Sequence, residues 1–270
     1  RVMTALHDTD VPVPKTFGYC DDETIIGTPF FVMDHVIGNI YWELLLPGCD
    51  PNQRREIYLS MNDTIAKLHN VDFNKVNLAD YGKHENYMGR QIHRWTKQYK
   101  DSETQMIPEI NELIEWLPKN IPSDQETSIV HGDFRLDNMI FDPITHEVKA
   151  ILDWELSTLG NPIADFTYHM MSWRLPAGAK GLGMMGSDLK SLNIPSESEY
   201  AELYYKKTGR EKIDNWDFYM AYNIFRLAGI AQGIVGRVRD GTASSSEAKN
   251  YEAFVPILGK LGWSIVEGIK

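Results

Sequence analysis

Helical periodicity dominates this 270-residue chain from residue 51 onward, and it changes only between residues 127 and 153. In that interval the apolar residues form short β-type runs over 127–130, 139–141 and 148–152. On either side their spacing predicts helices over 51–69, 87–101, 106–118, 197–208, 215–238 and 245–268. The chain is long enough to bury a sizeable core, so this order predicts an α+β fold with a small β region among helices.

Capping residues support several of these helices. Asp50 precedes Pro51, which places an N-cap before a proline at the first helical position. Ser196 and Glu199 form the capping-box pattern at the start of the fourth helix. Asp214 is the expected cap of the fifth.

The first 50 residues have a different character. The segment 11–18 (VPVPKTFG) contains two prolines and predicts a turn that leads into a short extended segment. The segment 28–36 (TPFFVMDHV) is rich in apolar and β-prone residues, and we expect it to form a buried strand.

A cluster of polar side chains lies inside the β region, in the sequence IVHGDFRLDNMIFD. Its members are His131, Asp133, Arg135, Asp137 and Asn138. Catalytic groups are often found in loops that a rigid scaffold holds in place. The same pattern also fits a polar loop whose Asp and Asn side chains only satisfy backbone groups.

Phosphoryl transfer requires a set of side chains of this kind. One carboxylate orients and deprotonates the attacking hydroxyl, while an Asn oxygen and a second carboxylate hold the Mg²⁺ that bridges the nucleotide phosphates. Asp133 and Asn138 fit the first carboxylate and the amide, and Asp153, in the sequence KAILDWE, fits the second carboxylate. A hairpin between Asn138 and Asp153 is expected to bring them together, and hard oxygen ligands suit Mg²⁺ better than zinc. Asp137 has no role in this pattern.

The segments HGDFRLDN and ILDWE resemble the catalytic and metal-binding loops of the aminoglycoside phosphotransferase and choline kinase branch of the kinase-like proteins. Longer stretches, such as YGKHENYMGRQIHRW and NWDFYMAYNIFRLAGIAQG, resemble the kinase-like domain at the N-terminus of the acyl-CoA dehydrogenase family members ten and eleven. The resemblance implies a protein-kinase-like, two-lobed α+β fold. Residues 1–36 would be the remainder of the N-lobe up to the hinge. Residues 37–270 would be a large helical C-lobe that holds the catalytic loop, the metal-binding loop and a substrate subdomain.

The resemblance also implies roles for the residues in these loops. Asp133 matches the catalytic base, and Asn138 and Asp153 match the Mg²⁺ ligands. His131 matches the residue that braces the catalytic loop against the metal-binding loop. Arg135 occupies the position from which a cation contacts the transferring phosphate.

The implied hinge follows the strand expected over 28–36. Backbone groups of Met33, Asp34, His35 and Val36 would hold the adenine of ATP.

The resemblance further implies elements that the sequence does not contain. These kinases cover the phosphates with a glycine-rich loop and clamp them with a strand Lys paired to a helix Glu. Lys15 is the only Lys before the hinge, and it follows two prolines, so we expect a surface Lys there. We therefore expect the chain to begin inside the N-lobe, which would be incomplete.

The function implied is ATP- and Mg²⁺-dependent phosphorylation of a small-molecule hydroxyl, with a 4-hydroxyacyl-CoA as the acceptor in hydroxy-acid catabolism. A fused or partner acyl-CoA dehydrogenase is expected. The expected compartment is intracellular, in a mitochondrion or peroxisome of a eukaryote or the cytoplasm of a bacterium. One alternative is a binding or docking domain that lacks the phosphate-clamp Lys and is catalytically impaired. A metal-dependent hydrolase is a weaker alternative, because it would need more converging carboxylates or histidines.

Charge and composition exclude other classes of function. The net charge of −11 argues against a nucleic-acid binder, whose affinity depends on cationic groups that neutralise phosphates. No uninterrupted apolar run approaches the length of a membrane span. Two cysteines provide no disulfide framework, which favours a reducing compartment.

Two further features are noted outside the polar cluster. Three cations recur at helical spacing: Arg90, Arg94 and Lys97. The pattern fits a solvated charged face, or a set of contacts to the phosphates of a large acceptor such as a coenzyme A ester. Asp165 lies in NPIADF, a typical helix start, where a carboxylate is placed to accept hydrogen bonds from backbone N–H groups and brace the loop.

Overall fold

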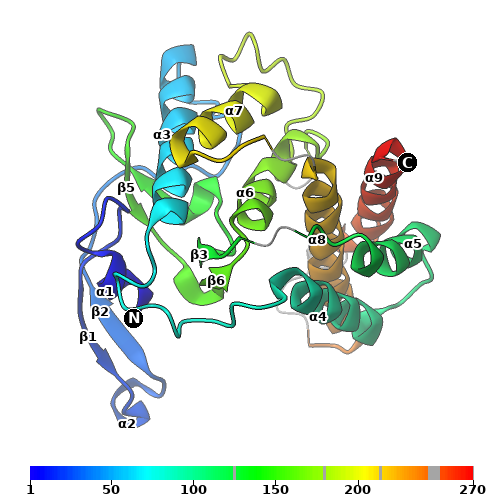
Figure 1. The fold of residues 1–270 in the computed structure, drawn as a ribbon, viewed down its shortest axis with the longest axis horizontal. Helices are drawn as coiled ribbons and strands as arrows, with labels where there is room; N and C mark the ends of the chain where they lie inside the picture. The colour runs from blue at the N-terminus through cyan, green and yellow to red at the C-terminus, as the bar shows by residue number, and fades with distance from the viewer. Residues whose placement is uncertain (124–125, 179–180, 213–214, 243–249, 270) are drawn as a thin grey trace.

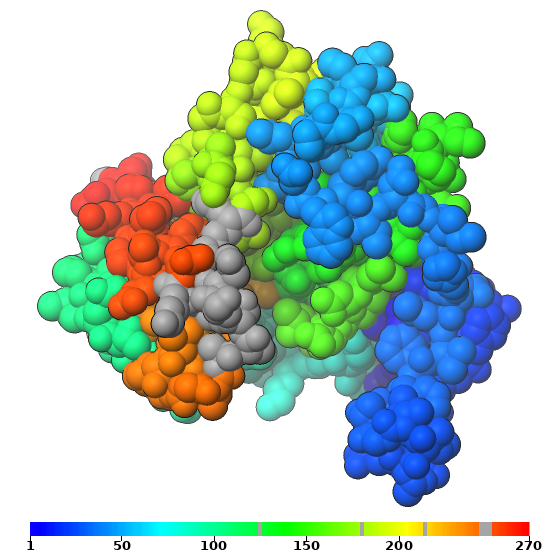
Figure 2. Space-filling model, turned by 180° about the vertical axis from the view of Figure 1, so that it is seen from behind, coloured from blue at the N-terminus to red at the C-terminus, as the bar shows by residue number. Residues whose placement is uncertain are grey.

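The computed structural model describes residues 1–123, 126–178, 181–212, 215–242 and 250–269. Within these ranges a helical body surrounds a small central β region, and the N-terminal elements project from one corner (Figures 1 and 2). The helical body includes α3 (Pro51–Asn70), α4 (Tyr87–Ser102), α5 (Pro108–Trp116), α6 (Pro162–Met170), α7 (Glu197–Thr208), α8 (Trp216–Arg239) and α9 (Phe254–Ile269). The predicted α+β class is confirmed.

Capping residues set the helix starts as predicted. The Asp50 carboxylate accepts hydrogen bonds from the backbone N–H groups of Asn52 and Gln53, and the Gln53 side chain accepts from the Asp50 N–H in return. The Ser196 hydroxyl accepts from the Glu199 N–H at the start of α7. The predicted cap Asp214 lies outside the described residues, and α8 follows Asn215.

The last helix begins later than the sequence predicts. Its expected range, 245–268, starts in a segment outside the described residues, and α9 starts at Phe254. Helix α8 packs against α4, α6 and α9, so it is the central helix of this part of the molecule.

The central β region consists of two antiparallel pairs. Strand β3 (Ser128–Val130) pairs with β6 (Thr158–Gly160), and β4 (Met139–Phe141) pairs with β5 (Val148–Ile151). Strands β3, β4 and β5 match the predicted runs. The three residues of β6 are too few to give a periodic signal.

The N-terminal elements are α1 (Val2–Leu6), β1 (Thr16–Cys20), α2 (Glu23–Ile26) and β2 (Phe30–Met33). Strands β1 and β2 pair with each other in an antiparallel sheet of two strands. The expectation of a buried strand over 28–36 is wrong on burial, since Phe31 and Val32 are each 50% exposed. An apolar run becomes buried only where another element covers it, and the other described elements leave this hairpin projecting (Figure 1).

No helix in the described ranges combines the length and the apolar character that crossing a bilayer requires.

Candidate active site

The β4–β5 hairpin brings the two halves of the polar cluster together. Met139 pairs with Ile151, and the Leu152 N–H donates to the Asn138 carbonyl oxygen at 2.8 Å. Asn138 and Asp153 therefore lie at the same end of the hairpin, as predicted from the sequence.

Asp133 is held by contacts to both of its carboxylate oxygens. The Tyr168 hydroxyl donates to Oδ1 at 2.7 Å, and Asn138 Nδ2 donates to Oδ2 at 3.1 Å. Asn138 Nδ2 also donates to the Asp133 carbonyl oxygen at 2.9 Å. Both donors are neutral and hold the carboxylate in one orientation, which suits a group that accepts a proton.

The Asn138 side chain has a consequence for metal binding. Its Nδ2 atom is turned toward Asp133, so its amide oxygen is the atom left to act as a ligand.

His131 ties the catalytic loop to the end of β5. Its Nε2 lies 2.8 Å from the Leu152 carbonyl oxygen, and its Nδ1 lies 3.2 Å from the Asp133 backbone nitrogen. A carbonyl oxygen accepts and a backbone N–H donates, so the two partners specify the tautomer with its proton on Nε2. The ring is fully buried and links the residue before Asp153 to Asp133.

Arg135 and Asp137 form a local ion pair. Arg135 Nε donates to Asp137 Oδ1 at 3.0 Å, and its Nη2 donates to Oδ2. Burial opposes the charge on Arg135, but the hydrogen bonds and the charge of Asp137 outweigh it, so the pKa of the guanidinium lies above its usual value. Asp137, which had no role in the sequence pattern, thus orients Arg135.

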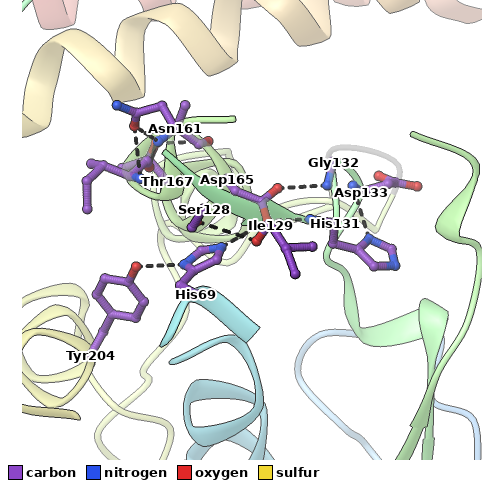
Figure 3. A network of polar contacts seen from close by, with 12 residues as sticks. His69, Ser128, Ile129, His131, Gly132, Asp133, Asn161, Asp165, Thr167 and Tyr204 are labelled. Carbon is purple, nitrogen blue, oxygen red and sulfur yellow. Dashed lines mark hydrogen bonds and ion pairs between the residues drawn. The ribbon is translucent and has the colours of Figure 1, made fainter. Parts of the chain in front are cut away.

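A buried polar network contacts the backbone of the catalytic loop (Figure 3). The Asp165 carboxylate accepts hydrogen bonds from the backbone N–H groups of His131 and Gly132, both at 2.8 Å. It also lies 3.2 Å from His69 Nε2, and His69 Nδ1 lies 2.6 Å from the Tyr204 hydroxyl.

The charges in this network follow from its partners. Burial alone would raise the pKa of Asp165. The hydrogen bonds from His69 and the loop together have the larger, opposite effect, so the pKa lies below its usual value and the carboxylate is ionised. Burial lowers the pKa of His69, which is therefore neutral: its Nε2–H donates to the Asp165 carboxylate, and its Nδ1 accepts from the Tyr204 hydroxyl. The expectation that Asp165 contacts backbone N–H groups of the loop is confirmed, whereas His69 showed no such link in the sequence.

Asp165→Asn is expected to lower the free energy of unfolding by about 2–3 kcal/mol. The amide group of Asn would face at least one of the donors that now hydrogen-bond to the carboxylate, so one N–H group would point at another and that hydrogen bond would be lost. Urea unfolding would measure this loss, with the exposed Asp101→Asn as a control that should change stability by less than about 0.5 kcal/mol. Equal stability of the two variants would contradict the supporting role of Asp165.

His169 lies beneath the same loop, with its ring centroid 5.5 Å from that of Phe134 and its Nε2 3.0 Å from the Tyr200 hydroxyl. Burial lowers its pKa to about 3. The unfolded chain binds this proton near pH 6.5, and the native chain does so only near pH 3, so this group makes stability fall as pH drops through that window.

We expect His169 to contribute a loss of roughly 3 kcal/mol in unfolding free energy between pH 6.5 and pH 4. His169→Gln should be less stable at pH 7 because it loses aromatic packing, yet its stability should fall less steeply toward pH 4. Denaturant unfolding at fixed ionic strength would measure both slopes, and His93→Gln at an exposed position should retain the wild-type slope. A slope in His169→Gln equal to that of the wild type would contradict the buried neutral state.

Asp153 lies at the edge of a large cavity beneath β1 and β2. The cavity has a volume of about 670 Å³ and is lined by Asp153 and Glu155 on one side and by Tyr19 and Phe31 on the other. The backbone of Asp153 is left-handed, with φ of 62°, a conformation that Asp and Asn tolerate better than most side chains. This sharp turn immediately follows the β5 end that His131 holds.

The predicted hinge residues line a neighbouring cavity of about 510 Å³. Met33, Asp34, His35 and Val36 lie on one side of it, with Ile140 and Leu152 among its other lining residues. Met33 and Leu152 also line the larger cavity, so the two cavities are neighbours that share these residues. The Asp34 N–H already donates to the Lys15 carbonyl oxygen at 2.9 Å, so this hinge group is engaged.

Two residues of the site were missed in the sequence. Tyr168, on α6, donates to Asp133, and burial raises its pKa, so it stays a protonated donor. Arg226, on α8, donates from Nη2 to the Gly132 carbonyl oxygen at 2.5 Å and stacks on the Tyr168 ring at 4.2 Å. No short motif contains them, because they reach the loop from helices 35 and 94 residues further along the chain.

The donor set suits a hard divalent cation. In the described ranges, no group of three or more His, Cys, Asp and Glu side chains converges as a metal cage would require. Mg²⁺ is commonly held by one or two protein oxygen ligands together with water and substrate phosphates. The Asn138 amide oxygen and the Asp153 carboxylate meet that requirement.

Comparisons with known proteins identify the family of the chain. The model of the phosphotransferase enzyme family matches residues 1–202. A crystal structure of a Ralstonia eutropha protein assigned to the aminoglycoside phosphotransferases is 49% identical, with a TM-score of 0.95, and the match covers 99% of this chain and 82% of that one.

Two curated relatives are longer proteins. Mouse acyl-CoA dehydrogenase family member 10 is 44% identical over 264 residues, which cover 97% of this chain and 25% of the relative. Human acyl-CoA dehydrogenase family member 11 is 39% identical over 264 residues, which cover 97% of this chain and 34% of the relative. The chain thus spans about a quarter to a third of the length of these relatives.

These matches confirm the resemblance inferred from the two loops and the kinase-like α+β fold that it implied. The chain belongs to the phosphotransferase enzyme family and has its kinase-like fold.

Proposed function

We propose that this chain transfers the γ-phosphate of ATP, with Mg²⁺, to a hydroxyl of a small molecule, and that the acceptor is a 4-hydroxyacyl-CoA. The observation that carries the proposal is the state of Asp133. Its carboxylate is oriented through both oxygens by neutral donors, beside the hairpin end that carries Asn138 and Asp153. A carboxylate held in this way can align an acceptor hydroxyl and take its proton as the phosphate is transferred.

The other loop residues have supporting roles in this proposal. Asn138 and Asp153 would hold Mg²⁺, which supplies positive charge against the nucleotide phosphates. His131 keeps the base and the metal-binding turn in a fixed relation through the Leu152 carbonyl oxygen. Arg135, held by Asp137, would place its charge near the transferring phosphate.

The two neighbouring cavities, one beside Asp153 and one beside the hinge, would hold the nucleotide. The hinge cavity, with apolar side chains such as Ile140 and Leu152, suits adenine, and the larger cavity beside Asp153 suits the phosphates. Because the Asp34 N–H is engaged, the hinge contacts would come from the other backbone groups of Met33 to Val36. Residues 1–36 would then form the N-lobe side of the cleft and 37–270 the C-lobe side.

The acceptor class rests on the relatives named as acyl-CoA dehydrogenase family members. In such a longer protein, a dehydrogenase segment would act on the same acyl-CoA pool as the kinase-like segment. This places a fused or partner acyl-CoA dehydrogenase among the proposed partners.

A specific observation favours a second candidate, a nucleotide-binding domain with little transfer activity. Among the described residues that line the two nucleotide cavities there is no lysine. Lys15 is exposed, and its ammonium lies 5.5 Å from the ring centroid of Phe17. A strand Lys on the phosphates is part of the machinery of related kinases.

One experiment separates the two candidates. The chain, both alone and within its full-length protein, would be incubated with ATP, Mg²⁺ and a panel of 4-hydroxyacyl-CoAs, free 4-hydroxy acids, aminoglycosides and choline. ADP release and a phosphate mass increase on a 4-hydroxyacyl-CoA would support the proposal. Nucleotide binding without phosphorylation of any acceptor, in both forms, would support the second candidate.

A further inference from the structure

A third cavity, distinct from the two that line the hinge and Asp153, opens beside the catalytic loop. It has a volume of about 380 Å³, and its lining includes Lys83, Arg90, Arg94, Glu155, Gly132 and Arg226. We propose that this cationic cavity binds the phosphate groups of the acceptor, and that Arg90 and Arg94 determine the specificity for a phosphate-bearing acceptor. The inference rests on the proposed function and adds the residues that recognise the substrate.

The charge of the cavity contrasts with that of the chain. Four cationic side chains line it against the single carboxylate of Glu155, whereas the whole chain carries a net charge of −11. In the described part of the chain, Lys83, Arg90, Arg94 and Arg226 form no ion pair with an acidic side chain at 4.0 Å or less. Uncompensated cations that converge on one concave surface favour an anionic ligand.

Two of the cations are positioned by contacts with their surroundings. Arg90 Nη2 donates to the Lys83 carbonyl oxygen at 2.7 Å, which holds the start of α4 against the preceding loop. The Arg94 guanidinium lies 5.4 Å from the Trp95 ring centroid. Guanidinium groups match the geometry of phosphate oxygens, so such groups suit a phosphate better than a point charge would.

Arg226 is the buried wall of the cavity. It is only 7% exposed, and its guanidinium lies between the rings of Tyr168 and Trp95, 4.2 and 5.3 Å from their centroids. Its Nε is buried without a hydrogen-bond partner in the described structure. A buried guanidinium with an unsatisfied N–H raises the local positive potential, because little water screens it.

The position of Arg226 connects the cavity to the reacting group. Its Nη2 contacts the carbonyl oxygen of Gly132, which is the residue before Asp133. The Tyr168 ring that it stacks on belongs to the side chain that donates to Asp133. The cavity therefore lies beside the loop that carries Asp133, the base proposed to take the proton of the acceptor hydroxyl.

The cavity is also separated from the proposed nucleotide site. The short helix η3 (Trp154–Leu156) lies between them, since Trp154 lines the nucleotide cavity, Leu156 lines the cationic cavity and Glu155 lines both. This arrangement gives the acceptor phosphates a place of their own while the nucleotide is bound.

Lys97 differs from Arg90 and Arg94 despite their common spacing along α4. Its charge is compensated by Asp101 at 2.5 Å, and it does not line the cationic cavity, whereas it shares with Arg94 another cavity further along α4. Of the three cations noted in the sequence, only the two arginines face the catalytic loop side, and Lys97 provides a matched control on the same helix.

The test is calorimetric titration of free coenzyme A into the chain saturated with Mg·ADP, which occupies the nucleotide site. The double variant Arg90→Gln/Arg94→Gln should weaken coenzyme A binding by about tenfold or more, given two lost charge-assisted contacts. Lys97→Gln should bind coenzyme A as the wild type does. Pantetheine, which lacks phosphates, should not show the dependence on the arginines, and inorganic pyrophosphate should compete with coenzyme A.

Several results would overturn the inference. One is the absence of coenzyme A binding to the wild type, and another is an affinity for coenzyme A in the double variant equal to that of the wild type. A third is a loss of Mg·ADP affinity in the double variant as large as its loss of coenzyme A affinity, which would place the arginines in the nucleotide site. Binding of a free 4-hydroxy acid that depends on the arginines, in place of coenzyme A, would assign the cavity to a carboxylate. Failure of the proposed function would appear separately, as arginine-dependent binding of coenzyme A without phosphorylation of any hydroxyacyl-CoA.

Discussion

Asp133→Asn is expected to lower the rate of phosphoryl transfer by about 10²–10⁴-fold while the fold is preserved. The amide retains the shape of the carboxylate and an oxygen for the Tyr168 hydroxyl, but it cannot take the proton of the acceptor. The loss should therefore appear in kcat, with little change in the affinity for nucleotide. Steady-state rates of ADP release with the acceptor identified in the screen would measure it.

Asp142→Asn is the matched control for this variant. Asp142 lies in the turn at the other end of the same hairpin, where it accepts hydrogen bonds from the Ile144 and Thr145 N–H groups. Turnover in Asp142→Asn should remain close to that of the wild type. Near-normal turnover in Asp133→Asn would remove the base from the proposed mechanism.

Asp153→Asn is expected to abolish the Mg²⁺ dependence of nucleotide binding. Asn tolerates the left-handed backbone at this position, with φ of 62°, so the change removes the charged ligand without the strain that Ala would introduce. Because the carboxylate would contact the metal directly, the loss should exceed the roughly 10–100-fold effect of removing an outer-shell partner.

Thermal unfolding with ADP, in the presence and absence of Mg²⁺, would measure this loss. Wild-type protein should show an additional rise in Tm when Mg²⁺ accompanies ADP, and Asp153→Asn should show only the rise due to ADP itself. An additional rise of the same size in both proteins would rule out Asp153 as the metal ligand.

Local patterns in the sequence were sufficient for most of the helices and for the order of the loop residues. The reason is physical: Asp50 with Gln53, and Ser196 with Glu199, satisfy N–H groups a few residues away, so the helix starts depend on neighbours in the sequence. The hairpin between Asn138 and Asp153 is local in the same sense.

The contacts that orient the base were not predictable in this way. Tyr168 and Arg226 reach the catalytic loop only because α6 and α8 pack beneath it, and the link of His69 to Asp165 spans 96 residues. Each of these side chains also fits an ordinary core position, so residue type alone does not reveal the partner. The ion pair between Arg135 and Asp137 is local, but an i, i+2 pair in a loop has no periodic signal.

The exposed β1–β2 hairpin bears on how firmly the molecule can hold a nucleotide. A sheet of two strands is marginally stable by itself, and with Phe31 and Val32 half exposed, little apolar burial opposes its local unfolding. Within the described residues, one wall of the proposed nucleotide cleft is built on β4, β5 and the buried network, whereas the other is a hairpin that no other described element covers. If ATP binds in the proposed cleft, part of its binding free energy is spent on ordering that second wall, so a contact that immobilises the hairpin would raise nucleotide affinity without touching the nucleotide.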